Sequence, residues 1–598
     1  MHTELVKIIL HGLFRLFGVV LCMALLPVCA ASMRPDDVFD DALESAEVPR
    51  TQAAAPEVPS SAATVALAAK AAACRESLFK ATSGALYCFT PAVRAAYLDY
   101  ARAKTRADLA SADKAIPEEF LRWIDRTPDV AGSVYSARVN CANVVMMLYA
   151  LRLDLGQECF EKYRQLALAM AIIHAEQGTQ ANLAPRAPIR LTIPACPLKP
   201  VNTKELGRTL DVNDHIINFL NGNEISDAKG KRTLIAADVM ANQGLQEAFN
   251  NYMKSNGCNV SVNCGDNSID SKRKSRVTGP DANGILSAFK LFRAAYVAKG
   301  LLPEKPDPSP SPAANCRFLI RNAECATSVK GNPKLPNCPL TAPWPVLTFL
   351  ARDMRSLREQ DEIWQRYCAK GELRTYAEYA GEIAQQPDFL AARRLCPFPF
   401  AYNTVPMMLK DGGVCGTMAM LATRTYKALG VPASTAGQPG HCALVYFAQD
   451  AKTGSYQCKG SQFMRAGPKD TSVLTPWNFG EKIERKKMVY HQSIAWAVNH
   501  GFGAFIDSMM AWQLFCLLPE ADRRDHGMKL LESGLALNPY NFLLADAGVA
   551  AAVTPEEKSR FEKSFAAALG SVTRPDCPKT GLYPDTIYGR LKKSLKLK

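Results

Sequence analysis

Two residues of the 598-residue sequence combine a nucleophile with a base at short spacing, Cys415 and His441. Cys415 follows two glycines at 412 and 413, which allow a sharp turn, and a helical pattern begins directly after it. Unpaired N–H groups and the dipole at a helix N-terminus stabilise a thiolate, and the same N–H groups can hold an oxyanion. A thiolate with an imidazole in reach performs nucleophilic acyl transfer.

The sequence predicts the elements that would carry these two residues. A helix is expected from Cys415 to Gly430, because apolar residues recur at helical spacing: Met418, Ala422, Tyr426 and Leu429. A short extended segment at 431–436, a Gln-Pro-Gly turn at 438–440 and a buried strand at 442–447 follow. His441 is therefore expected at the mouth of a strand.

Each residue taken singly also has an ordinary structural interpretation. Cys415 could be a buried structural cysteine and His441 a hydrogen-bonded core histidine. His491 and His500 are competing candidates for the base, but neither follows a glycine turn. Taken together, the flanking glycines, the helix start and the strand start favour a catalytic pair of Cys415 and His441 over two structural residues.

Three motifs here resemble the core of the transglutaminase-like superfamily, a branch of the papain-like cysteine enzymes. They are Gly-Gly-Val-Cys-Gly at 412–416, Ala-Leu-Gly-Val-Pro-Ala at 428–433 and Gly-Gln-Pro-Gly-His-Cys-Ala at 437–443. The resemblance implies an α+β fold with a papain-like core, in which a cysteine-bearing helix packs on an antiparallel sheet. It also implies Cys415 as nucleophile, His441 as base and no cofactor. The motifs span residues 402–447, with weaker similarity over 343–479.

The family usually places an aspartate on the strand after the histidine, where it orients the imidazole. The corresponding predicted strand, 455–462, contains no acidic residue. Three residues remain as orienting candidates: Ser461 and Gln462, which could hydrogen-bond the imidazole, and Asp450 in the turn before the strand.

The candidate oxyanion donors are the backbone N–H of Gly416 and the side chains of Tyr402 and Asn403 shortly upstream. No metal site is predicted. The sequence has no Cys-x-x-Cys pair with histidines nearby for zinc, and no calcium-loop signature.

The first residues predict export. Lys7 and Arg15 precede an apolar run at 17–30 that ends in small residues, which is typical of a signal peptide over residues 1–31. A retained membrane anchor is the competing interpretation, but the run is shorter than the ~20 residues of a spanning helix. A periplasmic or extracellular location is therefore expected.

The cysteine content fits that location. Two of the nineteen cysteines lie within residues 1–31, which leaves seventeen in the exported chain, a number typical of an oxidising compartment. Plausible bridges involve Cys258 with Cys264, and the set Cys316, Cys325 and Cys338.

The formal charge of +14 is spread along the chain, with local basic runs at 271–276 and 481–487. Such runs most often form solvated surface. The alternative is that they bind an anionic envelope surface. No nucleic-acid-binding motif occurs in the sequence, so no nucleic-acid partner is predicted.

The papain-like core is expected to be flanked by mainly helical domains. The predicted order is a signal peptide (1–31), a flexible leader (32–64), a helical domain (65–184), a mixed, mainly helical region with a cysteine-stapled loop (185–302), a proline-rich linker (303–314), the transglutaminase-like domain (315–480) and a helical C-terminal domain (481–598). Residues 530–541 of the last domain resemble half of a tetratricopeptide repeat.

The leading hypothesis is an exported transglutaminase-like cysteine enzyme acting on a protein or peptide substrate. Its acyl-enzyme would pass either to water, giving hydrolysis, or to an amine, giving crosslinking. The alternative is a catalytically inactive envelope binding or scaffold protein that keeps the fold. The absence of an acid from the predicted strand at 455–462 and the long helical flanks motivate that alternative.

Overall fold

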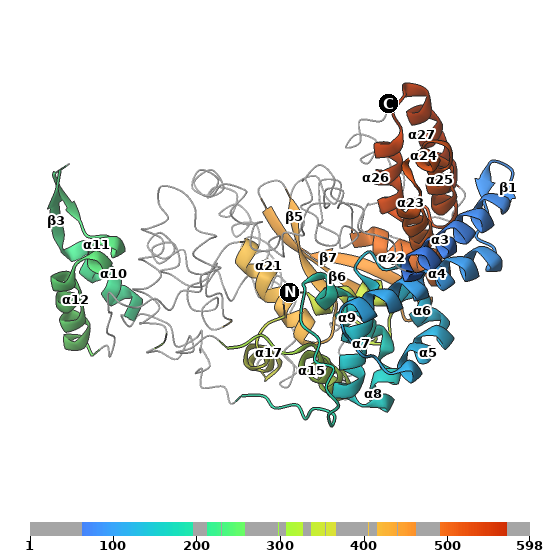
Figure 1. Ribbon diagram of the computed structural model, residues 1–598. Helices are drawn as coiled ribbons and strands as arrows, with labels where there is room; N and C mark the ends of the chain where they lie inside the picture. The colour runs from blue at the N-terminus through green and yellow to red at the C-terminus, as the bar shows by residue number, and fades with distance from the viewer. Residues whose placement is uncertain are drawn as a thin grey trace, which may run out of the picture.

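The computed structural model describes residues 62–194, 212–257 except 229, 297, 307–326, 336–365 except 353, 405, 415–438, 441–461 and 491–570. Within these residues the protein is rich in helix and has three small antiparallel sheets, so it is an α+β protein, as predicted. Figure 1 shows the helices of both chain ends packed beside the largest sheet.

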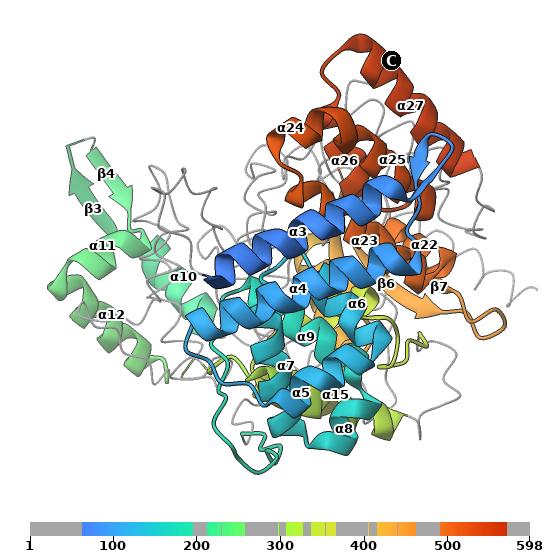
Figure 2. The same cartoon turned by 45° about the vertical axis from the view of Figure 1, so that its right-hand side comes forward.

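Residues 62–176 form a helical layer with one short hairpin. The helices are α3 (Ala62–Lys80), α4 (Pro91–Ser111), α5 (Glu118–Arg126), α6 (Pro128–Ser136), α7 (Cys141–Leu155), α8 (Gln157–Lys162) and α9 (Arg164–Glu176), and the hairpin pairs β1 (Thr82–Ser83) with β2 (Leu86–Tyr87). α3 and α4 lie side by side along the layer (Figure 2). The starts of α4 and α7 are fixed by side-chain caps from Thr90 and Asn140.

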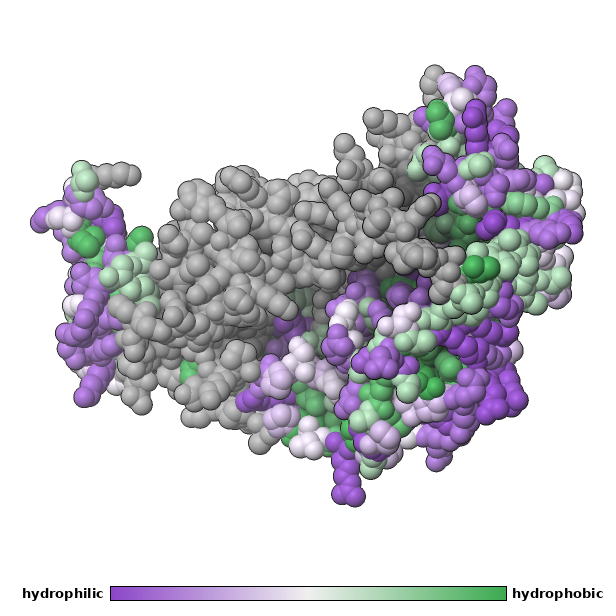
Figure 3. Space-filling view, in the orientation of Figure 1, coloured by the Kyte–Doolittle hydropathy of each residue, from purple (hydrophilic) through white to green (hydrophobic). Residues whose placement is uncertain are grey.

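A second unit follows in the chain and stands at one end of the molecule in Figure 1. It contains α10 (Val212–Gly222), the hairpin of β3 (Glu224–Asp227) and β4 (Gly230–Thr233), α11 (Ala236–Ala241) and α12 (Gln243–Ser255). Its small core includes an edge-on contact of Phe219 with Phe249, whose ring centroids are 5.2 Å apart. Hydrophilic residues cover much of its outer face (Figure 3).

The central part joins short helices to a three-stranded sheet. The helices are α15 (Pro312–Ala326), α16 (Trp344–Ala351), α17 (Leu357–Ile363) and α21 (Cys415–Ala428). The sheet has the order β5 (Ala433–Gln438), β6 (His441–Gln449) and β7 (Tyr456–Ser461), with both pairs antiparallel.

The last described residues are again helical. They form α22 (His491–His500), α23 (Phe502–Leu517), α24 (Glu520–Asp522), a π turn over Arg523–Gly527, α25 (Met528–Leu537), α26 (Phe542–Ala551) and α27 (Pro555–Gly570). α25 ends before Asn538, a buried residue whose amide donates to the carbonyl oxygen of Ala497 at 2.9 Å. The repeat-like segment at 530–541 therefore contains a helix end at its Asn-Pro step.

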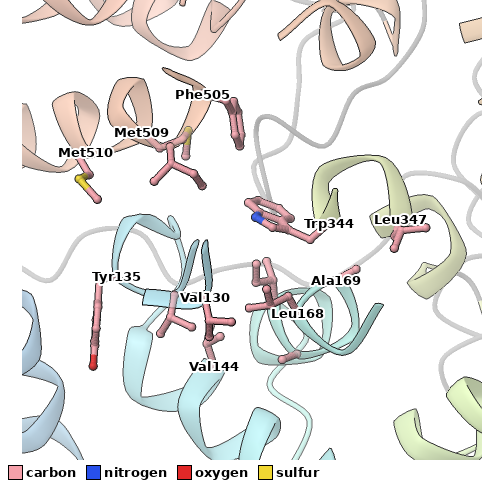
Figure 4. Packing of buried hydrophobic residues seen from close by; sticks show 14 of the residues in the cluster. Val130, Tyr135, Val144, Leu168, Ala169, Trp344, Leu347, Phe505, Met509 and Met510 are labelled. Carbon is pink, nitrogen blue, oxygen red and sulfur yellow. The ribbon is translucent and has the colours of Figure 1, made fainter. Parts of the chain in front are cut away.

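One large core unites the first helices, the sheet and the last helices. Trp344 of α16 lies between α9 and α23, with Leu168 and Ala169 on one side and Phe505 on the other (Figure 4). The Trp344 and Phe505 ring centroids are 6.0 Å apart. Elements from three of the predicted domains thus contribute to a single core, which we call the body core.

Side-chain caps divide two helical stretches of the chain. α6 ends at Ser136, and the Asn140 side chain caps the next helix, α7, which begins at Cys141. Residues 236–255 likewise form two helices, since Asn242 caps α12. Cys316 and Cys338, predicted as possible bridge partners, are separate thiols.

Candidate active site

Cys415 is the first residue of α21, as predicted from the glycine turn. The helix ends at Ala428, and Gly430 reverses the chain with φ +78°, a backbone conformation that favours glycine. The Val431 N–H donates to the carbonyl oxygen of Tyr426 at 2.8 Å and completes the cap. The chain then enters β5 at Ala433, beside the C-terminal end of α21.

His441 is the first residue of β6 and lies opposite Gln438, the last residue of β5. At the other end of the same ladder, Ala433 lies opposite Tyr446. The start of β5 and the C-terminal half of β6 therefore share one end of the sheet, and His441 stands at the opposite end.

α21 packs against β5 and β6 and lies beside the sheet in Figure 1. Near its C-terminal end, the Tyr426 ring stacks on Tyr446 with centroids 4.9 Å apart and planes 6° from parallel. One helical turn or more before that contact, Ala422 and Ala419 share a buried cluster with Leu444 of β6. The contact between α21 and β6 therefore continues from Tyr426 and Tyr446 toward the first residues of both elements.

The distances along the two elements match. Cys415 precedes Tyr426 by eleven residues, which is ~16 Å of α-helix. His441 precedes Tyr446 by five residues, which is ~17 Å of β-strand. The backbones of Cys415 and His441 therefore begin their elements at the same end of the α21–β6 unit.

Asp450 lies at the wrong end of the sheet to orient His441. It follows Gln449, the last residue of β6. Because Gln449 lies eight residues beyond His441, ~27 Å of strand separates Asp450 from His441. Its carboxylate accepts hydrogen bonds from the N–H groups of Lys452 and Thr453, both at 2.9 Å. These bonds, that of Thr453 most strongly, hold the pKa of Asp450 below its usual range.

Ser461 is closer to the required position. β7 starts opposite Gln449 and runs toward the His441 end, and Ser461 lies opposite Leu444. That position is three residues, or ~10 Å, short of His441 along β6. Gln462, the next residue, lies outside the described residues.

Gly416 is the second residue of α21, so its N–H belongs to the first helical turn, where N–H groups have no intrahelical acceptor. Tyr402 and Asn403 lie outside the described residues. Of the competing histidines, His500 is engaged elsewhere: its Nε2 lies 3.1 Å from the carbonyl oxygen of Leu537. His491 is the first residue of α22.

Three polar contacts that sequence reasoning missed fix α21 in place. Arg424 is buried and pairs with Glu359 of α17 at 3.0 Å. The amide of Asn322, on α15, donates to the carbonyl oxygen of Ala428 at 3.0 Å, and Lys427 donates to that of Arg352. The sequence does place a charged residue, Arg424, on an otherwise apolar helix face, which indicates a buried ion pair. Hydrophobic periodicity, however, does not identify the residue that pairs with it.

Most described cysteines outside the motif are poor nucleophiles. Burial raises the pKa of the Cys74 and Cys141 thiols to about 11 and that of Cys338 to about 12, and it also raises those of Cys316 and Cys516. A thiol whose pKa lies this far above neutral is scarcely ionised and reacts slowly. A cysteine with a reactive thiolate would therefore differ clearly in its rate of alkylation from these thiols.

Comparison of the chain with known protein families, with curated proteins and with solved structures finds no match. Among the described residues, no helix is long and apolar enough to cross a membrane, and no group of three or more His, Cys, Asp and Glu side chains is placed to hold a metal ion. The predicted signal peptide lies outside the described residues.

Proposed function

We propose that this protein is a transglutaminase-like cysteine enzyme that transfers acyl groups from peptide or amide bonds, and that it acts outside the cytoplasm. The observation that carries the proposal is that Cys415 and His441 open α21 and β6 at the same end of one packed unit. The sequence motifs around both residues support it, and so does the first-turn N–H of Gly416.

In the proposed reaction, His441 takes the Cys415 proton and the thiolate attacks the carbonyl carbon of the substrate amide. The carbonyl electrons move onto oxygen, where first-turn N–H groups of α21 stabilise the charge. The C–N bond then breaks, and His441 returns the proton to the leaving amine. The resulting thioester passes its acyl group to water or to a second amine, and Cys415 is regenerated.

A labelling experiment tests the nucleophile. The full-length protein is treated with iodoacetamide at pH 5 to 9, and the modified cysteines are identified by mass spectrometry. We expect Cys415 to react first and below neutral pH, because the other described thiols with resolved shifts have raised pKa values. Cys415→Ala should lose this fast phase, and the matched Cys338→Ala should keep it.

The base and the reaction need separate measurements. His441→Ala should move the labelling profile of Cys415 upward in pH, because the thiolate would lose its imidazolium partner. Release of amine from a peptide-amide library and incorporation of a fluorescent primary amine distinguish hydrolysis from crosslinking. If Cys415 is held in a disulfide, or reacts no faster than Cys338, the enzyme proposal is wrong.

The second candidate function is an inactive binding or scaffold protein with the same fold. The observation that favours it is that β7, Tyr456–Ser461, carries no acidic residue and that Asp450 lies at the far end of the sheet. A protein whose Cys415 labels rapidly while the peptide and amine libraries stay unchanged would favour this candidate.

A further inference from the structure

The two edges of the β5–β6–β7 sheet differ in what lies against them. At the β7 edge, the Asn499 side chain of α22 accepts from the Tyr456 N–H at 2.8 Å and donates to the Tyr456 carbonyl oxygen at 2.7 Å. A side-chain amide bonded in this way takes the place of a neighbouring strand and covers the start of that edge. In the part of the chain that the structure describes, no strand lies beyond β5 on the opposite edge.

The register of β5 shows which of its main-chain groups face outward. The Phe447 N–H donates to the carbonyl oxygen of Pro432 at 2.9 Å, so these two residues form a hydrogen-bonded pair. In an antiparallel ladder such pairs alternate with pairs that are not hydrogen-bonded. Counted along the register, Ala433, Thr435 and Gly437 occupy the second kind of position. Their N–H and C=O groups therefore point away from β6.

The outward groups differ in how accessible they are. Ala433 is buried, whereas Thr435 is partly exposed. No described group accepts from the Thr435 N–H, and among the described residues its carbonyl oxygen accepts from the Ser434 hydroxyl alone, at 3.1 Å, which leaves one lone pair. Gly437 has no side chain, so another main chain can approach it closely. The accessible edge thus runs from Thr435 toward Gly437.

This edge leads to the candidate active site. Gln438, the next residue after Gly437, lies opposite His441, at the end of the α21–β6 unit where Cys415 also begins its helix. Outward groups two residues apart on a strand repeat every ~7 Å, which is the repeat of the N–H and C=O groups along one side of an extended peptide. A peptide that paired with Thr435 and Gly437 and continued past Gln438 would bring its next residues to this end.

We propose that the β5 edge binds the peptide substrate as an added strand, through main-chain hydrogen bonds to Thr435 and Gly437, and holds the reacting amide just beyond Gln438. The proposal rests on the proposed function, which supplies the class of substrate. It narrows that class to extended segments with a free N–H at every second residue, because a helix or a proline at those positions cannot complete the ladder.

Peptide methylation tests the added strand. The full-length Cys415→Ala variant is used, so that binding is measured without turnover. The probe is a fluorescein-labelled octapeptide of alternating threonine and valine with one central glutamine, and fluorescence anisotropy gives its Kd. Two matched peptides carry N-methyl groups on alternate amides, one on the odd and one on the even positions. We expect one series to bind more than about tenfold more weakly and the other to change by less than about twofold. Equal losses, or none, would overturn the proposal.

The protein side of the ladder is tested at Thr435. Thr435→Pro removes the outward N–H without removing a donor to β6, a place where an edge strand tolerates proline. Thr435→Val keeps the N–H and suits a strand equally well. We expect the peptide to bind the proline variant at least about fivefold more weakly than the valine variant. Equal affinities in two folded variants would contradict the assignment, and if the proline variant does not fold, the methylation series still decides.

Two further outcomes separate this proposal from others. Period-two peptide binding by a protein whose Cys415 proves unreactive would keep the β5 edge as a peptide site and reject the enzyme proposal. A reactive Cys415 with no peptide binding would do the reverse. A dimer on gel filtration that dissociates in Thr435→Pro would show that a second copy of the chain occupies the edge, and the substrate-strand proposal would then be wrong.

Discussion

The two faces of the β5–β6–β7 sheet are built differently. On one face, Val445 and Phe447 of β6 and Cys458 of β7 join the body core, where the Phe447 ring lies 5.0 Å from that of Phe349. On the other face, Leu444 and Tyr446 pack against the single helix α21. On the body face, α22 packs against β7 and α16 lies against β6 through Phe349, whereas α21 depends on a small cluster and a few polar contacts.

This difference separates stability from chemistry. The body core determines whether the chain folds, while the α21 cluster, which we call the site core, determines where Cys415 stands relative to His441. A small core held by few contacts opens more readily than a large one. Substitutions in the site core should therefore change the reactivity of Cys415 before they unfold the protein, and substitutions in the body core should do the reverse.

The largest effect is expected from Trp344→Ala in the body core. Trp344 is 2% exposed, and its removal leaves a large cavity between α9 and α23. Such truncations cost about 3–5 kcal/mol of unfolding free energy, which urea denaturation measures. In conditions where the variant stays folded, the rate at which Cys415 is labelled should equal that of the wild type. An altered rate would show that the two cores are not separable.

A somewhat smaller effect is expected from Arg424→Met in the site core. Removing the guanidinium leaves the Glu359 carboxylate, 12% exposed, without the charge it pairs with at 3.0 Å. Breaking one side of a buried ion pair costs about 3 kcal/mol, whereas replacing both partners by apolar residues is close to neutral. We therefore expect Arg424→Met to lower stability and alter Cys415 labelling, and Arg424→Met with Glu359→Met to restore much of the stability. Equal losses in both variants would contradict this role.

The sequence predicts the local elements of the site well and their surroundings poorly. The helix from Cys415 and the strands on both sides of His441 lie within a few residues of their predicted ends, because glycine turns and apolar periodicity are local signals. The contact of Trp344 with Phe505 could not be predicted, since periodicity shows that a helix has an apolar face and not which distant face covers it. Asn242 acts as a cap only because its side chain bonds Leu245, a choice that composition does not reveal.

A pH dependence of stability is expected from the body core. His174 is 5% exposed, and burial lowers its pKa to about 4. Between pH 6.5 and 4 the unfolded chain binds a proton there that the folded protein does not, so stability falls as the pH falls through this window. The full shift corresponds to on the order of 3 kcal/mol. His174→Gln should flatten the curve of unfolding free energy against pH in this range.

Glu176, on the same helix, acts in the opposite direction, because burial raises its pKa and the folded protein then holds a proton more tightly as the pH falls. The comparison of wild type with His174→Gln removes this contribution, since both proteins keep Glu176. A curve with the same slope in both proteins would show that His174 is not the group responsible.

The smallest and sharpest comparison uses the same substitution on the two sides of the sheet. Asn499 of α22 holds the start of β7, exchanging hydrogen bonds with the Tyr456 N–H at 2.8 Å and its carbonyl oxygen at 2.7 Å. Asn322 holds the end of α21 through the Ala428 carbonyl. Asn322→Ala leaves a buried acceptor unpaired and should cost about 2 kcal/mol, whereas the exposed Asn499→Ala should cost about 1 kcal/mol.

The reactivity of Cys415 should separate these two variants more clearly than their stability does. Loosening the C-terminal end of α21 lets the helix shift along β6, and a shift of that kind moves Cys415 relative to His441. Loosening β7 from α22 leaves the α21–β6 contact as it was. We therefore expect Asn322→Ala to change the iodoacetamide labelling profile of Cys415 and Asn499→Ala to leave it unchanged. If Asn499→Ala has the larger effect, the site depends on the body face of the sheet, and the division between the two cores is wrong.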